Sequence, residues 1–162
     1  MAKRGQSLPI DFVAGLFIFL VMLAYFLVLW DSYSQRYVAT ASSIDMETTA
    51  IGIADQLVST GGSPNNWTAD PLTAQSIGLA WRQNELDPYR LSALSSLPYA
   101  NAKKILGAGR EIAIKIETLE RGKLPNSPNW TATGHSSKVV EVTRVAMMNG
   151  SAVNVKVQIY EN

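Results

Sequence analysis

Residues 12–30 read FVAGLFIFLVMLAYFLVLW, and this run decides the fold. It carries no charge, and Tyr25 is its only strongly hydrogen-bonding side chain. At about 1.5 Å per residue, a helix of this length spans roughly 28 Å, close to the thickness of a bilayer's hydrocarbon core. Lipid offers no partner for backbone amides, so a spanning run is helical. A buried core helix is the alternative, but a chain of 162 residues has little need of one so uniformly apolar. The sequence therefore favours a membrane span.

The residues that flank the run predict its orientation. Lys3 and Arg4 precede it and Asp31 follows it, so the positive-inside rule places the N-terminus in the cytoplasm and the rest of the chain outside the cell. Trp30 and Tyr33 lie where amphipathic rings favour the membrane interface. A secretory signal peptide has a shorter apolar region that ends in a small-residue cleavage site. This run ends in Leu-Trp-Asp, so we expect the anchor to stay on the protein.

The segment before the run, residues 3–12, reads KRGQSLPIDF. It resembles the class III signal peptide of archaeal type IV pilins and archaellins, in which basic residues and a glycine precede the cleavage site. The resemblance implies that a prepilin peptidase cuts between Gly5 and Gln6. It also implies that Asp11 and Phe12 correspond to the acidic residue and the following aromatic residue with which the hydrophobic helix of the family opens. The chain departs from the pattern because the acid is Asp rather than Glu and stands at the sixth mature position rather than the fifth.

Asp11 has two interpretations. An unpaired carboxylate costs a few kcal/mol if it is drawn into lipid, so carboxylates beside a membrane helix tend to have a functional partner. The resemblance implies that this partner is the N-terminal amine of a neighbouring subunit in a filament. The alternative is a hydrated interfacial carboxylate that helps the helix to begin through its dipole. Pro9 fits the first turn of that helix, where its missing N–H costs nothing.

Composition limits the remaining possibilities. About 130 residues follow the anchor, which is enough for one domain. A net charge of +1 with 17% charged residues provides no basic face for nucleic acid. The absence of cysteine excludes disulfides and thiolate metal sites. We expect a leader at residues 1–5, a membrane-spanning half of a long helix at 6–30, and an extracellular head at 31–162 that includes the helix's outer half.

Three segments match the N-glycosylation acceptor pattern, which is typical of surface turns in exported proteins. They begin at Asn66, Asn129 and Asn149. All three fall on the side that the predicted topology places outside the cell. The sequence therefore predicts a surface glycoprotein.

The helix is expected to continue beyond the membrane, because residues 31–59 contain no proline and a single glycine. Apolar residues recur near the 3.6-residue period, at Tyr37, Ala41, Ile44, Ile51, Ala54 and Val58. This stripe predicts the helix face that packs on the head. The sequence Thr60-Gly61-Gly62-Ser63-Pro64 then predicts the end of a helix of roughly 45 to 50 residues.

The middle of the chain predicts a loop and two short helices. Trp67 in the loop at 61–76 is expected to cover the core, and residues 77–81 suggest an edge strand. Asp87 and Pro88 predict a helix start, and Pro98 predicts another. The inward positions of these helices are Leu86, Leu91 and Leu94 for the first and Ala102, Ile105 and Leu106 for the second.

Three alternating segments then predict strands at residues 111–117, 139–147 and 153–159, with Asn149-Gly150 as a tight turn. For the middle strand, the alternation does not decide which of the two faces points inward. We expect a three-stranded antiparallel sheet whose apolar face is covered by the outer half of the long helix. The fold class is therefore α+β, with short helices in the αβ connection. This order of elements resembles that of type IV pilins.

The sequence contains few features that indicate catalysis or ligand binding. His135 is the only histidine, no phosphate-binding glycine motif is present, and nothing predicts a cofactor or an enzyme. The resemblance implies a structural subunit of a type IV pilus-like filament, with the membrane, a prepilin peptidase and copies of itself or other pilins as partners. The alternative is a minor pilin or a single-pass membrane-anchored surface protein whose head binds or adheres through an exposed Trp67, Trp81 or Trp130. A membrane-anchored enzyme would need a deep polar pocket.

Overall fold

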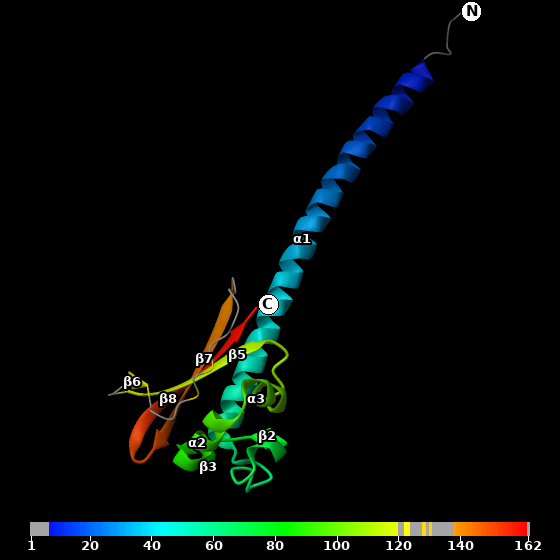
Figure 1. The fold of residues 1–162 in the computed structure, drawn as a ribbon. Coiled ribbons are helices and arrows are strands. Elements are labelled where there is room, and N and C mark those ends of the chain that lie inside the picture. Colours follow the sequence, from blue (N-terminus) through cyan, green and yellow to red (C-terminus); the bar gives the residue numbers. More distant parts are fainter. Residues whose placement is uncertain (1–6, 120–121, 124–127, 129, 131–137, 162) are drawn as a thin grey trace, which may run out of the picture. The chain divides into compact units, whose positions relative to one another are not determined.

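The computed structural model describes residues 7–119, 122–123, 128, 130 and 138–161 (Figure 1). The chain divides into two compact units, Met1–Ser42 and Ser43–Asn162. The helix α1 (Ser7–Ser59) contributes to both units. We call the second unit, Ser43–Asn162, the head. The fold is thus α+β, with a long apolar N-terminal helix and a C-terminal sheet, as the sequence predicted at this level.

The helix α1 begins and ends close to its predicted bounds. Pro9 lies in its first turn, where a proline removes no intrahelical hydrogen bond. The helix ends at Ser59, and Gly62 takes the left-handed backbone conformation, with φ of 81°. A residue with a Cβ is strained at such an angle, so glycine is suited to this position. The predicted helix stop is confirmed.

The described part of the head contains two sheets and, after α1, two short helices. The small sheet pairs β1 (Gly62–Ser63) with β2 (Ser76–Ile77), and a 3-10 turn, η1 (Pro71–Thr73), lies between them in sequence. Residues Asp87 and Pro98 each precede a helix, as predicted, and the two helices are α2 (Pro88–Ser96) and α3 (Tyr99–Ile105). Asp87 caps α2 by accepting a hydrogen bond from the Tyr89 amide at 2.9 Å.

Among the residues that the structure describes, the main sheet has six strands rather than the predicted three. Its order is β3 (Ala80–Arg82), β4 (Glu85–Leu86), β7 (Val139–Met148), β8 (Ser151–Tyr160), β5 (Glu111–Thr118) and β6 (Gly122–Lys123). The three predicted strands form its centre and are antiparallel. The edge strand β3 overlaps the strand suggested at residues 77–81. The strands that the prediction missed, β4 and β6, have only two residues each, and β4 pairs with β7 in parallel. Such short strands form through their tertiary neighbours and leave no alternation to detect.

The tight turn between β7 and β8 is confirmed. Asn149 and Gly150 both have positive φ, of 51° and 78°, which is the conformation of a two-residue hairpin turn. The turn fixes the register, with Val142 opposite Val157. It therefore settles the open question of the middle strand, because Val140, Val142 and Arg144 lie on the face that turns towards the core.

One core joins α1 to the inner face of the sheet. Ile112, Ile114 and Ile116 of β5 are buried together with alternate residues of β8, as predicted. The predicted stripe on α1 is wrong in its phase, because Tyr37, Ala41, Ile44 and Ile51 are exposed while only Ala54 and Val58 are buried. The core positions of α1 are Met46, Ala50, Ile53, Ala54, Leu57 and Val58. Within the head, this face carries more apolar side chains than the predicted stripe, so packing it on the sheet buries more apolar area.

The last carbonyls of α1 are hydrogen-bonded by residues far along the chain. The amides of Leu79, Ala80 and Asn84 donate to the carbonyls of Leu57, Thr60 and Val58, each at 2.9 Å. Gly78 makes this approach possible, because a Cβ there would lie 2.1 Å from the Thr60 carbonyl oxygen. The C-terminal end of a helix leaves such carbonyls without intrahelical partners, so these contacts fasten α1 to the β3–β4 region.

Candidate functional site

The most unusual surface of the molecule is the N-terminal part of α1. Its large apolar side chains are exposed on all sides of the helix, from Ile10 and Phe12 through Trp30. In the part of the chain that the structure describes, α1 is the one helix long and apolar enough to cross a membrane. Soluble proteins seldom expose a continuous apolar surface of this extent, so this surface needs lipid or other helices to cover it.

Asp11 and Phe12 both lie on this exposed surface, and Asp11 is the fifth residue of α1. The first turn of the helix therefore contains no acid. Because the dipole effect falls off within the first turn, the helix dipole gives little reason for a carboxylate at this position. Gly5 and Gln6, the predicted cleavage pair, lie outside the described residues.

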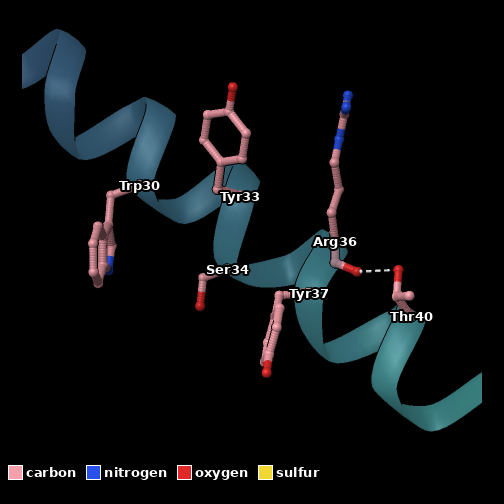
Figure 2. A pocket seen from close by; sticks show the side chains of 6 residues that line it. All are labelled: Trp30, Tyr33, Ser34, Arg36, Tyr37 and Thr40. Atoms are coloured by element: carbon pink, nitrogen blue, oxygen red, sulfur yellow. Dashed lines mark hydrogen bonds between the residues drawn. The ribbon is translucent and has the colours of Figure 1, made fainter. Parts of the chain in front are cut away.

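The apolar surface ends in a segment rich in aromatic side chains, Trp30–Tyr37, which we call the interface segment. Trp30, Tyr33 and Tyr37 are all strongly exposed. Figure 2 shows Trp30, Ser34 and Tyr37 on one side of the helix and Tyr33 and Arg36 on the other. These side chains line a shallow hollow along the helix but do not converge on a common point, so they do not form an enclosed ligand site.

A second exposed surface lies on the outer face of the sheet, at the end that contains β3 and β4. Trp81 is 60% exposed and stands at a β-bulge, where Trp81 and Arg82 together oppose Glu85. The guanidinium of Arg82 lies 4.8 Å from the centre of the Trp81 ring. Glu85 is next to Met147 of β7, which is also exposed. We call Trp81, Arg82, Glu85, Met147 and Val145 the outer patch, with Val145 two residues before Met147 on the same face.

Ion pairs link the elements of the head. Arg144 of β7 donates to Asp55 of α1 at 2.5 Å, and Arg110 donates to Asp45 of α1 at 2.7 Å. The hydrogen bond from Arg144 lowers the pKa of Asp55 below its ordinary value of 3.8. Lys138 also donates to the Ser43 hydroxyl. Two exposed acids of α1, Asp45 and Asp55, thus serve contacts within the head.

Tyr99, Lys103 and Glu111 form a half-buried cluster between α3 and β5. Lys103 and the Tyr99 hydroxyl donate to the two carboxylate oxygens of Glu111, at 2.6 and 2.5 Å, and lower its pKa. Burial, followed by the bond to Glu111, raises the pKa of Tyr99. The Ile112 amide donates to the same hydroxyl, so the cluster is saturated and fixes α3 on the sheet.

The other predicted site residues lie apart from one another. Trp67 is fully buried and its ring N–H donates to the Gly61 carbonyl at 2.8 Å, so its predicted role as a cover of the core is confirmed. Trp130 is half-buried with its ring 6.1 Å from that of Tyr99. Asn66 and Asn149 are exposed and thus accessible to a glycosyltransferase, and their glycosylation stays a prediction. Asn129 and His135 lie outside the described residues.

The described residues contain no group of three or more acidic, histidine or cysteine side chains that could hold a metal ion. Comparisons with family models, with curated proteins and with solved structures found no match to this chain.

The outer patch is the part of the surface that the sequence did not predict. Trp81 and Met147 are 66 positions apart in the numbering and share one end of the sheet only because β4, which pairs with β3, also pairs in parallel with β7. The exposed tryptophan itself was visible in the sequence as one of three candidates. Its neighbours depend on strand pairing, which two-residue strands do not reveal.

Proposed function

We propose that this chain is a structural subunit of an extracellular, type IV pilus-like filament and that α1 anchors it in the cell membrane before assembly. The observation that carries the proposal is the apolar surface of α1, which is exposed around the whole helix from Ile10 to Trp30. Lipid covers this surface before assembly, and the helices of neighbouring copies cover it in the filament. Because lipid and protein interiors are similarly apolar, close packing and paired polar groups must favour the filament.

Two further features support the proposal. The segment KRGQSLPIDF resembles a prepilin leader followed by an acidic-aromatic pair, so a prepilin peptidase is the expected processing partner. The same helix that carries the apolar surface supplies the core positions Met46–Val58 of the head. A subunit of this kind can exchange lipid for helix packing while its head stays folded.

Replacement of Asp11 tests the assembly role. In the proposed filament, Asp11 pairs with the N-terminal amine that cleavage after Gly5 creates. We expect Asp11→Ala to leave the protein in the membrane fraction, processed to a Gln6 start, and to abolish filaments seen by electron microscopy. Asp31→Ala is the matched control, because Asp31 already accepts a hydrogen bond from Gln35 of its own helix and should assemble normally. Normal filaments from Asp11→Ala would contradict the proposal.

The outer patch favours a second candidate, a minor pilin or single-pass surface protein with an adhesive head. Large exposed aromatic residues dominate binding surfaces, and Trp81 is presented by a bulge beside opposite charges. A detergent-free surface fraction that contains only dispersed monomers would favour this candidate. An intact N-terminus without cleavage at Gly5 would favour the single-pass surface protein in particular.

A further inference from the structure

We propose that the interface segment binds the headgroup layer of the outer membrane surface, with Arg36 holding the phosphate of a membrane phospholipid. This inference rests on the proposed membrane anchor and extends it. It assigns a ligand class to Arg36, a residue that the filament proposal does not use.

The interface segment begins where the apolar run ends and extends through the headgroup layer. The apolar run at residues 12–30 accounts for the hydrocarbon core, since it spans roughly 28 Å as a helix. From Trp30 to Arg36 the helix advances about 9 Å. The polar layer on each side of a bilayer is about 5 to 8 Å thick. When Trp30 sits at the end of the hydrocarbon core, the backbone of Arg36 therefore lies just beyond the headgroup layer. Because side chains on a helix tilt towards its N-terminus, the long Arg36 side chain can reach back to the level of the lipid phosphates.

The arrangement of the aromatic rings favours lipid over a single partner helix. Trp30 and Tyr37 project from one side of α1, and Tyr33 projects from the other (Figure 2). A partner helix would cover one side only, whereas a headgroup layer surrounds the helix. Amphipathic rings on both sides within about two turns of the helix suit this layer, because each has an apolar body and a polar tip.

Three polar side chains near Arg36 are hydrogen-bonded within their own helix. Ser32 and Thr40 donate to the carbonyls of Val28 and Arg36, each at 2.9 Å. Gln35 donates to the Asp31 carboxylate at 2.8 Å, so the nearest acid has a partner. Such internal bonds lower the cost of placing these groups beside lipid.

Arg36 has no ion pair with any residue that the structure describes. The positions three and four residues away on α1 are Ser32, Tyr33, Ala39 and Thr40, so no acid is within helical reach. Its guanidinium extends from the same side of the helix as Tyr33 (Figure 2). A guanidinium with free donors binds a phosphate through two parallel hydrogen bonds, which makes lipid phosphate a complementary ligand.

Solid-state NMR can test the contact directly. Full-length chain carrying Arg4→Gln, which removes the arginine expected at the opposite membrane surface, is labelled at the guanidinium carbon of arginine. It is reconstituted in vesicles of phosphatidylcholine with phosphatidylglycerol as the minor component. We expect lipid phosphorus to dephase the arginine signal. This dephasing should be lost in Arg36→Gln and kept in Arg82→Gln, since Arg82 stacks on Trp81 in the head.

A second measurement separates failure of this inference from failure of the anchor. The chain has no cysteine, so Leu20→Cys introduces a single thiol in the middle of the apolar run. Protection of this thiol from a water-soluble maleimide reports insertion in the vesicles. A protected thiol without dephasing, or with dephasing that survives Arg36→Gln, overturns the phosphate site alone. A reactive thiol overturns the membrane anchor as well. If the arginine signal shows no dephasing and Arg36→Gln forms fewer filaments, Arg36 instead forms an ion pair with an acid of a second copy, and the phosphate site is overturned.

Discussion

Arg90 connects four parts of the head through one nearly buried side chain, which is 13% exposed. It donates to the carbonyls of Gly61 and Ala80, at 2.5 and 2.9 Å, and to the Asn65 side chain at 3.1 Å. Its charge lies just beyond the C-terminal end of α1, where a cation interacts favourably with the helix dipole.

We expect Arg90→Ala to lower the free energy of unfolding of the head by about 2 to 3 kcal/mol, because the Ala80 carbonyl loses a charged donor. Urea denaturation of the full-length chain in detergent, followed by tryptophan fluorescence, measures the change. Lys104→Ala is the matched control, since Lys104 is exposed and should change stability by less than about 0.5 kcal/mol. Equal effects of the two substitutions would show that Arg90 is not needed to fix the end of α1.

Sequence reasoning located the end of α1 but not the residue that holds it. Gly61, Gly62 and Pro64 are local signals that end a helix wherever they occur. Arg90 lies 29 residues after Gly61, and its position depends on the whole loop between them. A contact of this kind has no local pattern from which it could be predicted.

At the scale of elements, α1 shows why a helix can be predicted while its buried face is not. Its outer half has apolar residues around much of its circumference, so two phases of the same 3.6-residue period fit the sequence. The sheet packs on the phase with Met46, Ile53 and Leu57. The buried faces of the strands at 111–118 and 151–160 were easier to predict, because each strand has one apolar face and one polar face.

Two isoleucines of α1 test this assignment. Ile53 is buried in the core, whereas Ile44 is 58% exposed. We expect Ile53→Ala to lower the free energy of unfolding by roughly 2 to 4 kcal/mol, because it leaves a cavity in the core. Ile44→Ala should cost less than about 1 kcal/mol. Thermal unfolding monitored by circular dichroism compares the two variants. A larger loss of stability from Ile44→Ala than from Ile53→Ala would show that the predicted stripe, not the Ile53 face, packs on the sheet.

At the scale of the whole molecule, acids tie the helices of the head to its sheet. Asp55 joins α1 to β7, and Glu111 joins α3 to β5. In each pair a basic partner holds the folded pKa of the acid below its ordinary value, which is 3.8 for Asp55 and 4.5 for Glu111. Both side chains are partly exposed, so each pair contributes about 1 kcal/mol or less.

These pKa directions predict how the head responds to acid. Because the folded pKa values are depressed, the stabilisation is complete above the unfolded values and is lost as pH falls through the folded ones. We expect the Tm of the head to stay level from about pH 7 to pH 5 and to fall below about pH 4. Thermal scans of the full-length chain in detergent across this range measure it. The double variant Asp55→Asn/Glu111→Gln should start lower and decline less, and a Tm that rises on acidification would contradict the assignment.

The strand order has a consequence for biosynthesis. The middle of the main sheet is occupied by β8, which lies between β5 and β7 and is the last of the described strands to be translated. While the ribosome is still making β8, the apolar faces of α1, β5 and β7 lack the strand that packs beside all of them in the finished core. The newly made head therefore cannot complete its core until its final strand is present, and a chain with such faces exposed is prone to aggregate during that interval.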